Sequence, residues 1–138
     1  MKAKIDCSWK NGMAFEADVN GFKIMLDADP AVGGENNGPR PKPLTLVSLA
    51  GCTGMDVISI LKKMRIEPEY FNISVEGELT DEHPKYYHKI HLVYELKGEG
   101  VDYEKVEKAV NLSQERYCGV SALLRFGAEI THEIRILT

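Results

Sequence analysis

The stretch LTLVSLAGCTGMDVISILKKM, residues 44–64, decides how this chain folds. Apolar side chains occupy almost every side of a helix drawn through it, which predicts a largely buried helix rather than a surface one. The polar exceptions recur at spacings of three and four residues, so they form one stripe along the helix: Thr45, Ser48, Cys52, Asp56, Ser59 and Lys63. We therefore predict a central helix with a single polar face that carries Cys52.

Cys52 lies in the middle of that stripe, between Gly51 and Gly54. Each glycine is about 1 kcal/mol less favourable than alanine inside a helix, so we expect another element to approach the helix closely there. Two interpretations of Cys52 stay open: a buried cysteine that packs as a small apolar side chain, or a reactive thiol. A reactive thiol must ionise, which needs a nearby cation, and Asp56 one turn along the helix would oppose ionisation.

The second informative cysteine is Cys118, which stands 66 positions after Cys52 and is followed by Gly119. No local turn joins two residues so far apart. If the fold brings them together, they form a dithiol redox site; if it does not, they are two buried small side chains. The third cysteine, Cys7, alternates with apolar residues and is assigned to strand packing, and an odd number of cysteines does not suggest a disulfide framework.

The remaining elements alternate between strands and helices. The dipeptides Asn11-Gly12 and Asn20-Gly21 separate short apolar segments, which predicts three antiparallel strands within residues 5–26. Further elements are expected as follows: strands over 70–79 and 86–96, a helix from 102 towards 117, a helical piece over 120–126 and a last strand over 128–137. This order predicts an α+β protein with antiparallel sheet and two principal helices.

Length and composition fit one globular domain that spans residues 1–138. The net charge is −4 and no basic run occurs, which argues against nucleic acid as the main partner. No secretory signal and no clear membrane span are expected, so we predict a cytoplasmic protein. His88 and His91 face opposite sides of a strand, and no spacing typical of a metal or nucleotide site occurs.

Residues 27–43 are rich in proline and glycine, which predicts a long loop with either a functional or a merely connecting role. Arg40 lies in this loop between Pro39 and Pro41, so its backbone is stiff. It precedes the Cys52 helix by only a few residues. It is therefore a candidate cation for the thiol, with a solvated loop arginine as the alternative.

Two segments carry a resemblance to a known family. They are residues 38–63, with Pro41, Leu44, Gly51-Cys52 and Asp56-Val57, and residues 111–136, with Leu112-Ser113, Tyr117-Cys118 and Ile130-Thr131-His132. Through them the chain resembles the OsmC/Ohr family of thiol-dependent organic hydroperoxide reductases, and within it the YhfA-like subgroup. The resemblance implies an OsmC-like fold, in which antiparallel sheets wrap around central cysteine-bearing helices in an intertwined homodimer with active sites at the subunit interface.

The resemblance also implies that Cys52 and Cys118 meet and act as the catalytic pair. In the family's reaction the first thiolate attacks the peroxide O–O bond, the alcohol leaves and the cysteine becomes a sulfenic acid. The second cysteine then forms a disulfide with it, and an external dithiol, such as a lipoyl or thioredoxin-like protein, restores both thiols. No metal, haem or flavin cofactor is implied, and no membrane partner is expected.

The chain departs from the family pattern before its first cysteine. The peroxidase branches carry a glutamate ten positions earlier, where this chain has Lys42, and the arginine that pairs with this glutamate has no match. The candidates to supply the positive charge are Arg40, Lys42 and Arg116, and Asp56 is a further candidate at the substrate site. Two functions therefore stay open: organic hydroperoxide reduction, and a thiol sensor or small-molecule-binding protein that lacks peroxidase turnover.

Overall fold

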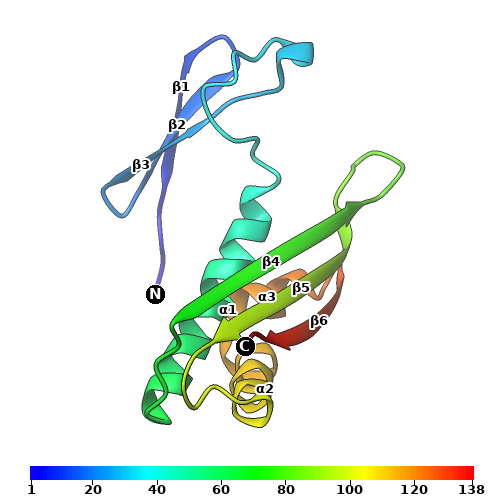
Figure 1. The fold of residues 1–138 in the computed structure, drawn as a ribbon. Coiled ribbons are helices and arrows are strands. Elements are labelled where there is room, and N and C mark those ends of the chain that lie inside the picture. Colours follow the sequence, from blue (N-terminus) through cyan, green and yellow to red (C-terminus); the bar gives the residue numbers. More distant parts are fainter. The chain divides into compact units, whose positions relative to one another are not determined.

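The computed structural model describes all 138 residues. The chain forms two compact units, residues 1–45 and residues 46–138, and each unit contains one three-stranded sheet (Figure 1). In the C-terminal unit, the helices pack against its sheet. The two sheets and the helices confirm the α+β class predicted from the order of the elements.

The N-terminal unit is an antiparallel meander in the order β1-β2-β3, with strands β1 (Asp6–Asn11), β2 (Ala14–Val19) and β3 (Phe22–Leu26). Asn20 and Gly21 join β2 to β3 with positive φ angles of 53° and 84°. Positive φ at both positions is the requirement of a type I′ turn, which the Asn-Gly pair predicts. The three expected strands are therefore confirmed.

The loop after β3 is ordered by one carboxylate. Asp27 is 3% exposed and accepts hydrogen bonds from the backbone N–H groups of Ala28 at 2.8 Å, Asn37 at 3.1 Å and Glu35 at 3.2 Å. The N–H of Asn37 contributes most to holding the pKa of Asp27 below its usual value. A short 3₁₀ helix, η1 (Pro30–Val32), lies inside the loop, which is therefore structured despite its many breakers.

The C-terminal unit contains most of the regular structure. Its elements are α1 (Leu44–Lys63), β4 (Tyr70–Leu79), β5 (Tyr87–Lys97), α2 (Tyr103–Leu112), the π-helical turn η2 (Ser113–Tyr117), α3 (Gly119–Leu124) and β6 (Glu129–Ile136). Strands β4 and β5 form an antiparallel hairpin, but β6 pairs with β5 in parallel. The prediction of a purely antiparallel sheet is therefore wrong at β6, because the chain crosses over through three helical segments before it re-enters the sheet.

The core of this unit lies between the sheet and the helices. Alternate residues of β5 are at most 2% exposed, and they share one cluster with the inner faces of α1 and α2: Ile90, Leu92, Tyr94 and Leu96 with Leu49, Val57, Leu61, Val106, Ala109 and Val110. A Cβ at Gly54 would lie 3.1 Å from Ile73 Cδ1, whereas one at Gly51 would meet open space. The expected close approach to α1 therefore occurs at Gly54, against β4.

Helix α1 is only partly covered within the chain. It is long and apolar enough to cross a membrane by length and composition alone, a test that core helices of soluble proteins also pass. One face packs on the core, whereas Val47, Met55 and Ile58 are 62%, 77% and 41% exposed. The sequence predicts burial nearly all round, so this prediction is wrong for the outer face within a single chain.

Candidate functional site

Three chemically active side chains of the C-terminal unit lie together. The sulfurs of Cys52 and Cys118 and a carboxylate oxygen of Asp56 all lie within 4.8 Å of one another. Cys52 is partly exposed, whereas Cys118 is 3% exposed. Cys7, on β1 of the N-terminal unit, is exposed, contrary to its predicted role in strand packing.

Two irregularities of the backbone position Cys118. Its N–H donates to the carbonyl of Ser113 at 2.7 Å, which closes the wide π-helical turn η2. Cys118 itself then adopts an extended conformation, with φ −78° and ψ 99°, and caps the start of α3. The N–H of Ser121 donates to the Cys118 sulfur at 3.4 Å. Turns of this wide kind are frequent at functional sites, where they redirect a side chain.

The surroundings of Cys52 disfavour its thiolate. Burial raises the pKa of the Cys52 thiol most, and a hydrogen bond to Cys118 and the negative charge of Asp56 raise this pKa further. The N–H of Val120, at the start of α3, acts in the opposite direction. None of the main influences on the pKa of Cys52 is a cation. Asp56 raises this pKa and therefore opposes ionisation of the thiol, as the sequence predicts.

Behind the cluster lies a buried hydrogen-bond network that the sequence did not reveal. Ser113 Oγ donates to Asp56 Oδ2 at 2.8 Å and lies 2.8 Å from Thr53 Oγ1, which in turn lies 2.7 Å from Tyr94 Oη. Gln114 Nε2 donates to the same tyrosine oxygen at 2.8 Å. Asp56 is therefore fixed through a chain of hydroxyl groups that reaches the centre of the sheet.

Gln114 connects this network to a cation. Its side-chain oxygen accepts from Ser121 Oγ at 3.1 Å and from the Arg125 guanidinium at 2.8 Å, and the guanidinium also donates to its backbone carbonyl at 2.7 Å. No buried side-chain nitrogen or oxygen is left without a partner. In the sequence, this network is indicated only by the polar pair Ser113-Gln114 at the end of an amphipathic helix. Polar residues at a helix end are usually exposed, so the pair does not by itself predict a buried network.

None of the three candidate cations is among the groups that dominate the pKa of Cys52. Arg40 belongs to the N-terminal unit, where it donates to the Gly38 carbonyl at 3.0 Å and lies 3.8 Å from Asp29. Lys42 is exposed in the same unit. Arg116 is exposed and stacks on its neighbour Tyr117, with 5.9 Å between guanidinium carbon and ring centre. Their roles stay predictions.

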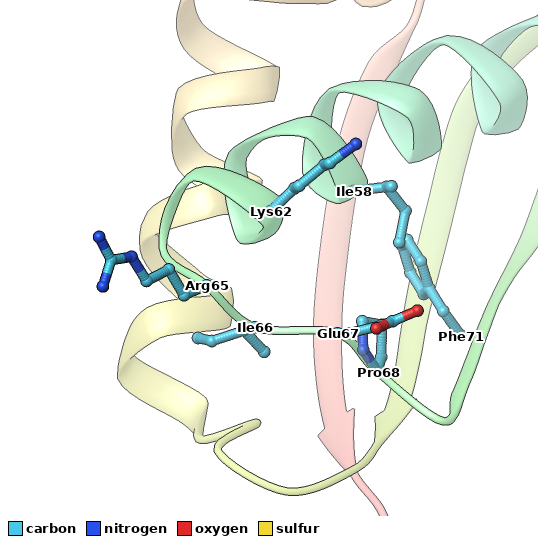
Figure 2. Close-up of a pocket in the computed structure, with 7 residues that line it drawn as sticks. All are labelled: Ile58, Lys62, Arg65, Ile66, Glu67, Pro68 and Phe71. Atoms are coloured by element: carbon cyan, nitrogen blue, oxygen red, sulfur yellow. The ribbon is translucent and has the colours of Figure 1, made fainter.

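Apolar hollows line the outer side of α1. One, of about 570 Å³, lies at the C-terminal end of the helix and is lined by Ile58, Lys62, Arg65, Ile66, Glu67, Pro68 and Phe71 (Figure 2). Figure 2 shows the Arg65 guanidinium directed away from Phe71. A second hollow shares Ile58 and Phe71 and extends along the helix to Gly51, the neighbour of Cys52.

A partly exposed cysteine next to a buried one, held by an α+β scaffold with a central helix, is typical of proteins that carry a pair of cysteines at their functional site. A family model described as OsmC-like protein matches residues 34–133, and the chain therefore belongs to the OsmC-like family. The family resemblance expected from the two cysteine segments is confirmed.

Individual relatives agree with this assignment. Protein YhfA of Escherichia coli K12 is 28% identical over 138 residues, which cover 99% of this chain and 98% of the relative. A crystal structure of a hypothetical protein from Aquifex aeolicus VF5 is 30% identical, with a TM-score of 0.83 and coverage of 100% and 99% of the two chains. The organic hydroperoxide resistance protein OhrB of Bacillus subtilis, at 21% identity and a TM-score of 0.61 with 98% of both chains covered, shares the fold.

Proposed function

We propose that this protein reduces organic hydroperoxides to alcohols with Cys52 and Cys118 as its redox pair. The observation that carries the proposal is the proximity of the two sulfurs, within 4.8 Å, although 66 sequence positions separate the residues. Formation of a disulfide of about 2.05 Å requires a further approach of the two sulfurs.

The reaction runs in three balanced steps. The Cys52 thiolate attacks the outer oxygen of ROOH, the O–O bond breaks, and ROH leaves after taking up a proton while Cys52 becomes a sulfenic acid. The Cys118 thiol then displaces water from the sulfenic acid and forms the Cys52–Cys118 disulfide. An external dithiol reduces this disulfide by thiol–disulfide exchange and is itself oxidised. The sum is ROOH plus a dithiol giving ROH, water and a disulfide.

The exposures of the two cysteines support this order. A peroxide reaches the partly exposed Cys52 more readily than Cys118, which is 3% exposed. The hollow that extends along α1 to Gly51 is lined mainly by apolar groups, so it suits a hydrocarbon tail. We therefore expect organic hydroperoxides to be preferred over hydrogen peroxide.

The active form in this proposal is a homodimer of single OsmC-like domains. The family match crosses the boundary between the two compact units, which supports one domain over residues 1–138. Trp9 and Phe22 of the N-terminal sheet are 63% and 73% exposed, and Val47 of α1 is 62% exposed, so a second copy has apolar surface to cover. The cytoplasm, where thiols stay reduced, is the proposed location.

The test is peroxide consumption with a dithiol reductant, comparing cumene and tert-butyl hydroperoxides with hydrogen peroxide. Cys52→Ser abolishes turnover in this proposal, and Cys118→Ser permits one oxidation of Cys52 and then stalls. Cys7→Ser is the matched control because Cys7 is an exposed cysteine on β1 of the N-terminal unit and is not part of the pair, and it keeps the wild-type rate. Equal rates for wild type and Cys52→Ser would end the proposal.

Two observations favour a second function, a thiol sensor or small-molecule-binding protein without fast turnover. The raised pKa of Cys52 leaves little thiolate, and Lys42 stands where peroxidases of the family carry a glutamate. Such a protein would oxidise once, slowly, and a dithiol would not sustain consumption of peroxide. The same assay followed over many turnovers separates the two functions.

A further inference from the structure

We propose that the reduced protein binds one thiophilic divalent metal ion, such as Zn²⁺ or Cd²⁺, between Cys52, Cys118 and Asp56. The peroxide reaction above requires no metal, so this ion is an additional ligand of the same residues. Two of the three ligand atoms come from helix α1 and the third from the N-cap of α3, and all lie within 4.8 Å of one another.

The spacing of the three atoms suits such an ion. A tetrahedral zinc ion with Zn–S bonds of about 2.3 Å places two ligating sulfurs about 3.8 Å apart. The atoms in this cluster therefore need to close by at most about 1 Å, which rotation of the side chains supplies. Two thiolates and one carboxylate leave a fourth position for water.

The carboxylate is already oriented for this task. Ser113 Oγ donates to Asp56 Oδ2 at 2.8 Å, so a buried hydroxyl anchors one oxygen of the carboxylate. Metal-binding carboxylates are usually held in this way, with one oxygen fixed by a hydroxyl and the other free to bind the ion. Ser113 is in turn fixed by Thr53 and is 0% exposed, so the orientation of Asp56 is rigidly maintained.

The charges of the cluster point to a cation. When ionised, all three groups are negative, and the main groups that act on Cys52 include no positive side chain. A divalent ion would replace the two thiol protons, which leave to the solvent, and would convert the mutual repulsion of the three anions into attraction. Binding involves no change of oxidation state, and a bound ion keeps the two sulfurs from forming a disulfide.

The test is a titration of the fully reduced protein with Cd²⁺, read from the thiolate-to-cadmium absorption in the ultraviolet, and with Zn²⁺ in competition with a chromophoric chelator. We expect one ion per chain. Binding is lost in Cys52→Ser and Cys118→Ser, and also in wild-type protein whose thiols have been alkylated, which needs no mutation. Cys7→Ser binds like the wild type because Cys7 lies on β1.

Ser113→Ala tests the orientation of the carboxylate. Loss of a group that orients a metal ligand commonly weakens binding by about 10–100-fold, and Asp56→Asn should weaken it by more. Circular dichroism establishes that each variant is folded. The absence of a bound ion in the reduced wild type, unchanged affinity in folded Cys118→Ser, or loss of binding in Cys7→Ser would each overturn the proposal. Because no peroxide is present, this result is independent of the hydroperoxide reaction.

Discussion

The hydroxyl of Tyr94 offers a direct test of the buried network, and Tyr94→Phe is the perturbation. Tyr94 is 0% exposed, and its hydroxyl bonds to Thr53 Oγ1 at 2.7 Å and to Gln114 Nε2 at 2.8 Å. Its removal leaves neither partner without a hydrogen bond, because Thr53 still contacts Ser113 at 2.8 Å and Gln114 still donates to Thr53 at 3.3 Å. Phenylalanine fills nearly the same volume, so no cavity term is added.

The expected magnitude follows from these contacts. Two neutral hydrogen bonds contribute about 0.5–1.5 kcal/mol each to the free energy of unfolding. Because both partners keep another hydrogen bond, no penalty for an unsatisfied group is added, and we expect Tyr94→Phe to lower the free energy of unfolding by about 1–2 kcal/mol. Gln114→Leu should lose more, because it leaves the buried hydroxyl of Ser121 and the guanidinium of Arg125 without their side-chain acceptor. Tyr70→Phe, at a tyrosine that is 45% exposed, is the matched control and should change stability by less than about 0.5 kcal/mol.

The assay is urea unfolding of the reduced proteins at one fixed protein concentration, since association of subunits would change the apparent stability. With an m-value of about 2 kcal/mol/M, the loss for Tyr94→Phe lowers the midpoint by about 0.5–1 M. A midpoint for Tyr94→Phe equal to that of Tyr70→Phe would refute the role of this hydroxyl. A loss as large as that of Gln114→Leu would show that the remaining hydrogen bonds do not compensate as the geometry indicates.

Three further predictions concern other parts of the chain. The lowered pKa of Asp27 means that its contribution to stability is complete above the pKa of an unfolded aspartate and is lost as the pH falls through the lower folded value; the protection factor of the Asn37 amide, its exchange rate relative to an unstructured amide at the same pH, should therefore fall in acid, and Asp27→Asn should lower it already at neutral pH. Burial lowers the pKa of His132, so the unfolded chain binds a proton more readily than the folded one. The unfolding midpoint of the wild type should therefore fall as the pH drops below about 6.5, and the midpoint of His132→Gln should fall less over the same pH range. Gly54→Val should destabilise the protein more than Gly51→Val in thermal melts, because a Cβ at Gly54 would lie 3.1 Å from Ile73 Cδ1 and one at Gly51 meets no atom of the chain within 4 Å; equal effects would place the close approach elsewhere.

The sequence predicted those elements whose cause lies within a few neighbouring residues. The helix at 44–63 follows from its periodicity and from Pro43 before it, and the β2–β3 turn follows from Asn20-Gly21, which accepts positive φ at both positions. The family resemblance likewise rested on short local segments around the cysteines. In each case local side-chain chemistry was enough to determine the outcome.

The sequence failed where the cause is distant along the chain. The direction of β6 is set by the crossover that precedes it, and nothing in its own alternating residues distinguishes a parallel from an antiparallel neighbour. The wide turn before Cys118 depends on one backbone hydrogen bond to Ser113, which periodicity does not encode. Thr53 and Gln114 look like ordinary polar residues of helices, and only the packing of α1 against α2 and β5 reveals that each satisfies the other.

The Cys52 thiol lacks a nearby positive charge that would stabilise its thiolate, which fast reduction of peroxides requires. The C-terminal unit brings the two sulfurs together, but burial and the Asp56 carboxylate raise the pKa of Cys52, and the Val120 N–H is the main group that lowers it. A cation that activates the thiol must therefore act from beyond this immediate environment. Arg40 and Lys42 of the N-terminal unit are candidates, and Arg116, which stacks on Tyr117, is the third. Hydroperoxide reduction in Arg40→Ala, Lys42→Ala and Arg116→Ala should fall most for the residue that supplies this charge, and unchanged rates in all three would show that none of them supplies it.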